Sequence, residues 1–154
     1  MRDRLSTISR AVIVAAIALT VPAIAAAPAD MVAQRVAAFK SLGGSFKAIN
    51  DALKGGATDA KALAAPAANM NAQARKLATL FPAGTGPDKV KTSALPAVWS
   101  ENPEFKAHQA KLVAATAKLQ QAAASGSIDA VKAQIPQIGG ACKGCHDKFR
   151  GKAS

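Results

Sequence analysis

The stretch Cys142-Lys143-Gly144-Cys145-His146 ends eight residues before Ser154, the last residue of the chain. Its two cysteines and its histidine are spaced i, i+3 and i+4, so on a helix both sulfurs and the imidazole project from one face. C-x-x-C-H is the attachment sequence of c-type haem, in which two thiols form thioethers and the histidine ligates the iron. The motif therefore predicts covalent haem on Cys142 and Cys145, with His146 as the axial iron ligand.

The same residues have three other interpretations. A Cys-x-x-Cys pair serves thiol–disulfide redox chemistry, but such a site usually opens a helix after a strand, and no strand pattern precedes Cys142. A zinc site would take His108 as its fourth ligand, and His108 lies a helix away without ligand-like neighbours. A structural disulfide between Cys142 and Cys145 has poor geometry at three-residue spacing within a helix. Haem is favoured over all three.

The N-terminus predicts export. Three arginines precede an apolar run over residues 11–27, and Ala23 and Ala25 are small residues at the two positions that a signal peptidase reads. We expect residues 1–25 to form a signal peptide cleaved after Ala25, with Ala27 as the alternative site. A retained membrane anchor is the rival interpretation, but the run has only about the minimum length for a span. Since c-type haem is attached outside the bacterial cytoplasm, we expect a periplasmic protein without a stable membrane anchor.

The chain is basic, with a formal net charge of +11. Its lysines recur at helical spacing, as at Lys40, Lys47 and Lys54, without interleaved aromatic residues. This pattern indicates a solvated helix face rather than a nucleic-acid interface. Such a surface suits an acidic redox partner protein. No paired acid and base and no activated nucleophile accompanies the motif, so an enzyme is not expected.

Four apolar stripes of helical period occupy nearly all of residues 26–154, which are expected to form one all-α domain. Start and stop signals bound these stripes. The expected helices run from an Asp30 cap to Gly55-Gly56, from after Thr58 to Pro82, from Asn102-Pro103-Glu104 to Ser125-Gly126, and from Ser127 to Phe149.

The last of these helices carries the haem motif on its apolar stripe, so the haem is expected inside the bundle. Pro136 predicts a kink in this helix, because proline cannot donate the hydrogen bond that its position needs. Gly139-Gly140 either lets the macrocycle approach the backbone or forms part of a tolerated bend. The residues from Pro82 to Ser100 form a long loop, and its expected anchors in the bundle are Leu95, Val98 and Trp99.

A C-terminal C-x-x-C-H on the last of four helices resembles the class II c-type cytochromes, of which cytochrome c′ is the best known. Four stretches support the resemblance, and they are 141–150 (ACKGCHDKFR), 81–86 (FPAGTG), 97–100 (AVWS) and 35–40 (RVAAFK). The resemblance covers essentially all of residues 26–154. It implies an up-down-up-down antiparallel four-helix bundle with one covalently bound haem c.

The resemblance also implies roles on the first helix. The position matching the family's distal residue is Phe39, which has no lone pair for iron and is expected to shield the sixth site; core packing is the alternative. Arg35 matches the arginine that meets a haem propionate, with a solvated helix charge as the alternative. Arg150 is expected to return to the proximal side of the ring.

A cytochrome c′-like protein has five-coordinate iron that binds NO or CO and undergoes one-electron redox, and it often forms a homodimer through its first two helices. The rival interpretation is a six-coordinate electron carrier, and a third is a bundle whose haem only stabilises the fold. Met31, Met70 and His108 are the other residues with a donor atom for a sixth ligand. We expect Met31 to lie too far along the helix, Met70 to fill the core and His108 to be half-buried.

Overall fold

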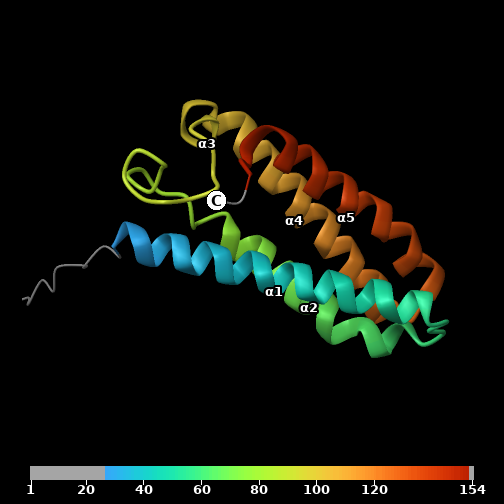
Figure 1. Ribbon diagram of the computed structural model, residues 1–154. Helices are drawn as coiled ribbons and strands as arrows, with labels where there is room; N and C mark the ends of the chain where they lie inside the picture. The colour runs from blue at the N-terminus through green and yellow to red at the C-terminus, as the bar shows by residue number, and fades with distance from the viewer. Residues whose placement is uncertain (1–26, 153–154) are drawn as a thin grey trace, which may run out of the picture.

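The computed structural model describes residues 27–152, in which four main helices run antiparallel to one another (Figure 1). The helices are α1 Pro28–Lys54, η1 Ala60–Leu63, α2 Ala64–Leu77, α3 Ala97–Ser100, α4 Asn102–Ser125 and α5 Ile128–Phe149. The expected signal peptide, residues 1–25, lies outside the described part of the chain. Along residues 27–152, no helix combines the length and the apolar character that a membrane crossing needs.

Two of the expected helix caps are wrong. The first helix begins at Pro28, before Asp30, with Ala27 as an N-cap that makes no side-chain hydrogen bond. Proline suits this start because the first helical N–H needs no partner, and the Asp30 carboxylate complements the helix dipole from within the first turn. Asn102 is the first residue of α4 rather than its cap, which is Glu101.

A polar side chain caps the start of the second helical segment and the start of the fourth main helix. The Oγ of Ser127 accepts a hydrogen bond from the N–H of Ala130 at 3.1 Å, so the predicted start of α5 is confirmed. The second segment begins with the short helix η1, capped by Asp59, before α2 continues it. Helix α2 ends at Leu77, earlier than expected, and α5 continues without a break through the exposed Pro136.

Three of the four pairs of neighbouring main helices pack closely against each other. Helix α1 packs on α2, α2 on α4 and α4 on α5, whereas α1 and α5 make few close backbone contacts. The most buried large side chains come from all four main helices, and they include Ile49, Met70, Leu119, Val131 and Ile138. The apolar stripes of α2, α4 and α5 therefore face the core as expected. On α1 the expected stripe is only partly buried, because Val36 and Phe39 are 44% and 37% exposed.

The loop after α2 closes one end of the bundle beside the end of α5 (Figure 1). Val98 is buried, and the indole N–H of Trp99 donates to the carbonyl of Pro82 at 3.0 Å, so both are anchors as expected. Leu95 is not, since its side chain is 37% exposed. The backbone holds this position instead, because the N–H of Leu95 donates to the carbonyl of Phe149 at 3.0 Å and that of Gly151 to Ser93 at 2.7 Å.

Candidate functional site

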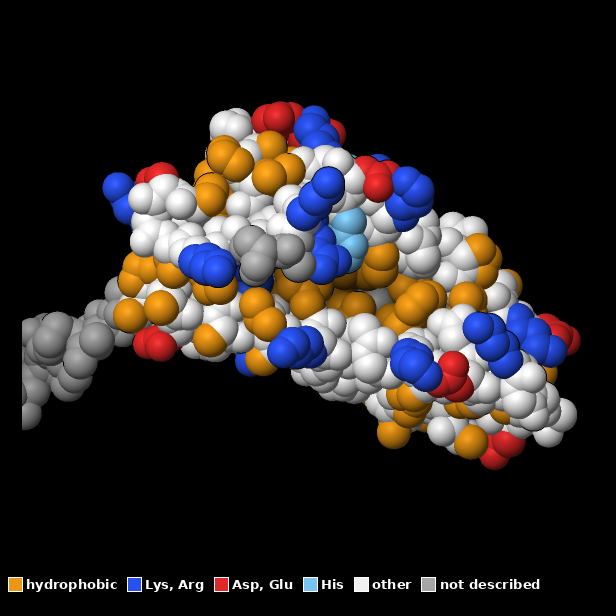
Figure 2. Space-filling model, in the orientation of Figure 1, with side chains coloured by type: hydrophobic (Ala, Val, Ile, Leu, Met, Phe, Trp, Pro, Cys, Tyr) orange, Lys and Arg blue, Asp and Glu red, His pale blue; other side chains and the backbone are white. Residues whose placement is uncertain are grey.

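A cavity of about 450 Å³ lies where α1 and α5 do not pack against each other. Side chains from α1, α2, α4, α5 and the loop line it, and most of them are apolar. Figure 2 shows hydrophobic side chains gathered in this hollow, with Lys or Arg and a histidine at its edge. Val36 and Phe39 are exposed because their side chains line this cavity instead of packing between two helices.

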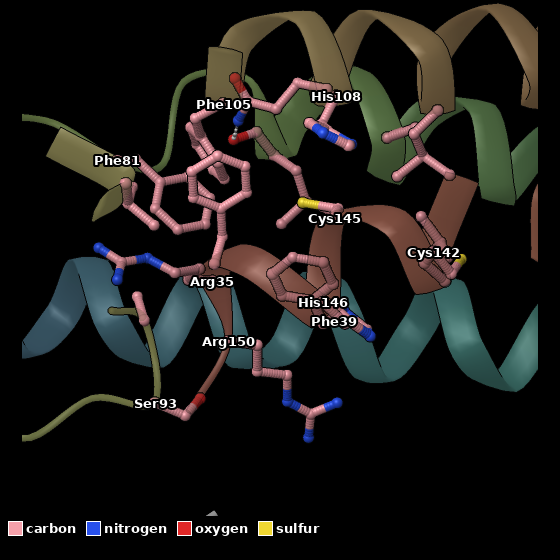
Figure 3. Close-up of a pocket in the computed structure, with 18 of the residues that line it drawn as sticks. Arg35, Phe39, Phe81, Ser93, Phe105, His108, Cys142, Cys145, His146 and Arg150 are labelled. Carbon is pink, nitrogen blue, oxygen red and sulfur yellow. Dashed lines mark hydrogen bonds between the residues drawn. The ribbon is translucent and has the colours of Figure 1, made fainter. Parts of the chain in front are cut away.

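Helix α5 presents the whole haem motif to the cavity. Cys142, Cys145 and His146 all line it from one face of the helix, and all three are half-buried (Figure 3). Both thiols are free. By contrast, Gly139 and Gly140 do not line the cavity, and nothing lies within 4 Å of a Cβ added at either residue. Close approach of a macrocycle to these two glycines is therefore not supported.

The two thiols are in an environment that keeps them protonated at neutral pH. Burial raises the pKa of Cys142, and burial together with the neighbouring Cys142 raises the pKa of Cys145 to about 11. Both residues are also near the C-terminus of α5, where the helix dipole disfavours a negative charge. Redox-active cysteines instead have a lowered pKa. The thiol–disulfide interpretation is therefore disfavoured.

The zinc interpretation also lacks support, because residues 27–152 contain no cluster of three or more His, Cys, Asp or Glu side chains that could hold a metal ion. Two imidazoles line the cavity, those of His108 and His146, and the one that belongs to the haem motif is His146. Burial lowers its pKa, and the positive charge of Arg150 lowers it further, while Asp147 acts in the opposite direction. The neutral imidazole favoured by this environment is the form that binds a metal.

Phe39 faces His146 from the opposite helix. Their ring centroids are 6.1 Å apart with the rings edge to face, so α1 supplies an aromatic side chain to the side of the cavity opposite the imidazole (Figure 3). Within the described residues, no methionine lines the cavity: Met70 is fully buried in the core and Met31 packs against that core. The expected core role of Met70 is confirmed.

Arg35 is almost fully buried, at 3% exposure, so its interpretation as a solvated helix charge is wrong. Its Nε donates to the carbonyl of Leu80 at 3.0 Å, and its Nη2 donates to Oγ1 of Thr85 at 2.8 Å. Nη1 donates to Oγ1 of Thr92 at 3.4 Å, and the guanidinium carbon lies 4.2 Å from the centroid of the Phe81 ring. Arg35 thus ties the loop to α1 while also lining the cavity.

An aromatic cluster forms the end wall of the cavity beside Cys145. Phe105 contacts Phe81 and Phe149 with ring centroids 4.7 and 5.2 Å apart. His108 is half-buried as expected, edge-on to Phe149 at 5.6 Å, and its Cε1 lies 3.5 Å from where a Cβ on Gly144 would stand. A Cβ at position 144 would therefore stand in ordinary van der Waals contact with His108.

Similarity to known proteins agrees with this geometry. The family model for cytochrome C′ matches residues 30–150 of the chain. The chain belongs to the cytochrome c′ family. A cytochrome c′ from Rubrivivax gelatinosus is 39% identical over 127 residues, covering 81% of this chain and 97% of the relative. Another, from Rhodopseudomonas palustris, is 37% identical and covers 100% of both chains.

Solved structures of cytochromes c′ share the fold. The nitric oxide complex of a cytochrome c prime variant from Alcaligenes xylosoxidans has a TM-score of 0.75 at 29% identity, over 83% of this chain and 98% of that one. A cytochrome c′ with ligand-controlled dimer dissociation has a TM-score of 0.75 at 28% identity, over 83% and 99%. The antiparallel four-helix bundle predicted from the sequence is confirmed.

Cytochromes c′ are haem proteins rather than enzymes, and each chain binds one covalently attached haem c. The residues of this chain fit that cofactor. Two free thiols and a neutral imidazole project from one helix face into an apolar cavity, and the two helices on either side of it are not packed together. The alanine-rich helices leave this volume unfilled by side chains.

Sequence reasoning missed several cavity residues. Phe81 and Phe105 both line the cavity, although sequence reasoning assigned neither a role at the site. Gly43 also lines it from α1. Its signal was present in the sequence, because Gly43 follows Phe39 by four residues and therefore shares its helix face.

Proposed function

We propose that this protein is a periplasmic haem c protein whose iron has one protein ligand, binds NO or CO, and changes oxidation state by one electron. The observation that carries this proposal is the side chain opposite His146. The Phe39 ring on α1 lies edge to face with the imidazole of His146 on α5, with ring centroids 6.1 Å apart, and it has no lone pair to offer a metal. A sixth coordination position on that side would be shielded but left open.

In this proposal, Cys142 and Cys145 hold the cofactor through thioethers and His146 holds the iron through its neutral imidazole. The bound haem supplies an iron that exchanges one electron and binds diatomic gases. The apolar walls exclude water from it.

Arg35 lines the cavity, and its five N–H donors make four hydrogen bonds to Leu80, Thr85 and Thr92. The remaining N–H would meet a haem propionate. Arg150 would stand on the proximal side, where its charge already acts on His146.

The remaining parts of the proposal concern location and partners. Export through the signal peptide of residues 1–25 would deliver the chain to the periplasm, where an acidic redox protein would be its electron partner. A homodimer through the first two helices would match the dimeric relative, and Val36 of α1 is 44% exposed. A six-coordinate electron carrier is the alternative function, and it would need a protein ligand that the Phe39 side of the cavity does not offer.

An absorption spectrum tests the coordination number. The ferric protein is expected to be high-spin, because a single imidazole leaves the iron with a weak ligand field. The ferrous protein is expected to bind CO in one step, without first losing a protein ligand. A low-spin ferric spectrum with a methionine–iron charge-transfer band would support the electron carrier instead.

A methionine at position 39 should convert five-coordinate iron into six-coordinate iron. In the Phe39→Met variant, a thioether replaces the shielding ring, and most of the ferric iron is expected to become six-coordinate and low-spin. The matched control is Phe46→Met, since Phe46 also lines the cavity from α1 but lies seven residues, or roughly 10 Å, along the helix. Equal spectra for the Phe39→Met variant and the unmodified protein would reject the position assigned to Phe39.

A further inference from the structure

The mouth of the cavity carries basic side chains. The charged residues that line the cavity are Arg35, Lys40 and Arg150, and no Asp or Glu is among its lining residues within 27–152. Arg35 is almost fully buried, whereas Lys40 and Arg150 are exposed. Positive charge therefore reaches the surface from α1 on one side and from the residue after α5 on the other, and Figure 2 shows Lys or Arg at the edge of the hollow.

The loop after α2 adds a third cation beside these two. Residues 92–94 line the cavity, and the exposed Lys91 directly precedes them. Ala94 forms an antiparallel bridge with Arg150, and Figure 3 places Ser93 on the same side of the pocket as Arg150. The three exposed cations at the mouth form the basic rim, which consists of Lys40, Lys91 and Arg150.

Nearby acids do not neutralise the basic rim. Within residues 27–152, none of its three members forms an ion pair, and the acid nearest to Arg150 in sequence, Asp147, pairs with Lys143 instead. The buried Arg35 is assigned to one haem propionate, and a second propionate would neutralise at most one rim charge. The mouth therefore stays positive when the cofactor is bound.

An exposed apolar side chain lies next to the basic rim. Leu95 follows the loop residues that line the cavity, and its side chain lies beside Gly151, but Leu95 does not line the cavity itself. Its exposure of 37% is therefore independent of what fills the cavity. Electron-transfer encounters bury little surface and depend on complementary charge, and an apolar contact adds affinity.

We propose that the basic rim and Leu95 form the docking surface for an acidic electron-transfer protein. One electron passes at this face from the ferrous haem to the oxidised metal centre of the partner, which is reduced. No proton moves, and no bond forms or breaks. This inference rests on the proposed one-electron function and adds the face of the molecule at which the electron leaves. The partner's negative charge steers it to the rim, and salt weakens that attraction.

The test uses an acidic plastocyanin, a one-electron copper protein, as the probe. Calorimetric titration of the ferrous holoprotein with cuprous plastocyanin measures affinity without electron transfer. At an ionic strength of about 0.1 M, Lys40→Glu/Lys91→Glu is expected to weaken binding by at least about fivefold, and about 1 M salt should remove most of this difference. Leu95→Ser should also weaken binding, by a factor that changes little with salt.

The matched control is Lys54→Glu/Lys118→Glu, which changes the net charge by the same amount away from the mouth. Both lysines are exposed and neither lines the cavity. Lys54 lies fourteen residues, or roughly 21 Å, along α1 from Lys40, which is about twice the screening length at 0.1 M salt. This variant should bind plastocyanin within about twofold of the wild-type affinity. Intact mass should show one haem per chain in both double variants.

Oxidation of the ferrous protein supplies a second readout. Its rate with cupric plastocyanin, divided by its rate with the cationic tris(phenanthroline)cobalt(III) ion, should fall in Lys40→Glu/Lys91→Glu. The ratio reports surface charge because a change at the haem itself affects both oxidants alike. The ratio should stay near the wild-type value in the control variant.

Three outcomes would contradict the inference. Equal plastocyanin affinity in the rim variant and the control variant would overturn it while leaving the proposed function intact. Binding of the wild-type protein to phosphatidylglycerol vesicles but not to plastocyanin would assign this face to a membrane surface and overturn it as well. A wild-type haem that neither oxidant can oxidise would reject both the inference and the proposed one-electron function.

Discussion

Replacing both attachment cysteines, in the Cys142→Ala/Cys145→Ala variant, is expected to reduce covalent haem from one per chain to none. A thioether needs a sulfur at each position, and the described residues contain no other cysteine. Intact mass under denaturing conditions measures the loss directly. Alanine is preferred to serine as the substitute because it places no hydroxyl in an apolar cavity.

Loss of the haem should also lower the stability of the protein. Without haem, the cavity of about 450 Å³ between α1 and α5 stays open, and apolar side chains around it lose their contacts. We expect a loss of at least about 3 kcal/mol, similar to a large truncation in a core. For a domain of this size, that lowers the melting temperature by about 10 °C. Thermal unfolding followed by circular dichroism gives this value.

Two comparisons make the result specific to the thiols. Lys143→Ala changes the exposed residue between the cysteines, and it should keep full haem content. Lys143 pairs with Asp147 at 2.5 Å on the surface and with no other acid among residues 27–152. Each single cysteine variant should keep one thioether. Covalent haem on the double variant, or no added mass on the exported wild-type protein, would contradict the assignment of Cys142 and Cys145.

The sequence predicted the helices well because their periodic pattern is local. On α5, the spacing of the motif alone placed Cys142, Cys145 and His146 on one face, and all three line the cavity. The helix starts were less accurate. Asp30 has the chemistry of a cap, but Pro28 is equally suited to a first helical residue, and no local rule ranks the two.

The site was harder to predict because periodicity identifies an apolar face without identifying what covers it. Phe39 belongs to the apolar stripe of α1, yet it lines a cavity while its neighbour Ala38 is in the core. Arg35 shows the same limit for polar residues. Its hydrogen-bond partners, Leu80, Thr85 and Thr92, are 45 to 57 residues away in the chain, so only the tertiary structure brings them together.

Arg35→Leu is expected to destabilise the protein by about 3 kcal/mol, which is similar to the loss expected on removal of the haem. A leucine at position 35 would keep apolar contact with Phe81 but would remove every hydrogen bond that Arg35 makes to the loop. The buried carbonyl of Leu80 and the Thr85 hydroxyl each lose their arginine donor, and an unsatisfied buried polar group costs about 1–3 kcal/mol. Arg35→Lys should recover only part of this loss, since one ammonium cannot reproduce the spread of the guanidinium donors.

Urea unfolding of the holoprotein measures these differences, and Arg75→Leu is the matched control. Arg75 is exposed near the end of α2, so its replacement should change stability by no more than about 0.5 kcal/mol. Amide hydrogen exchange adds a local readout: residues 82–96 should lose protection in Arg35→Leu, because the loop is held to α1 through this side chain. Wild-type stability and protection in that variant would show that the loop is held without Arg35, by its backbone contacts to Phe149 and Gly151 and by the Trp99–Pro82 hydrogen bond.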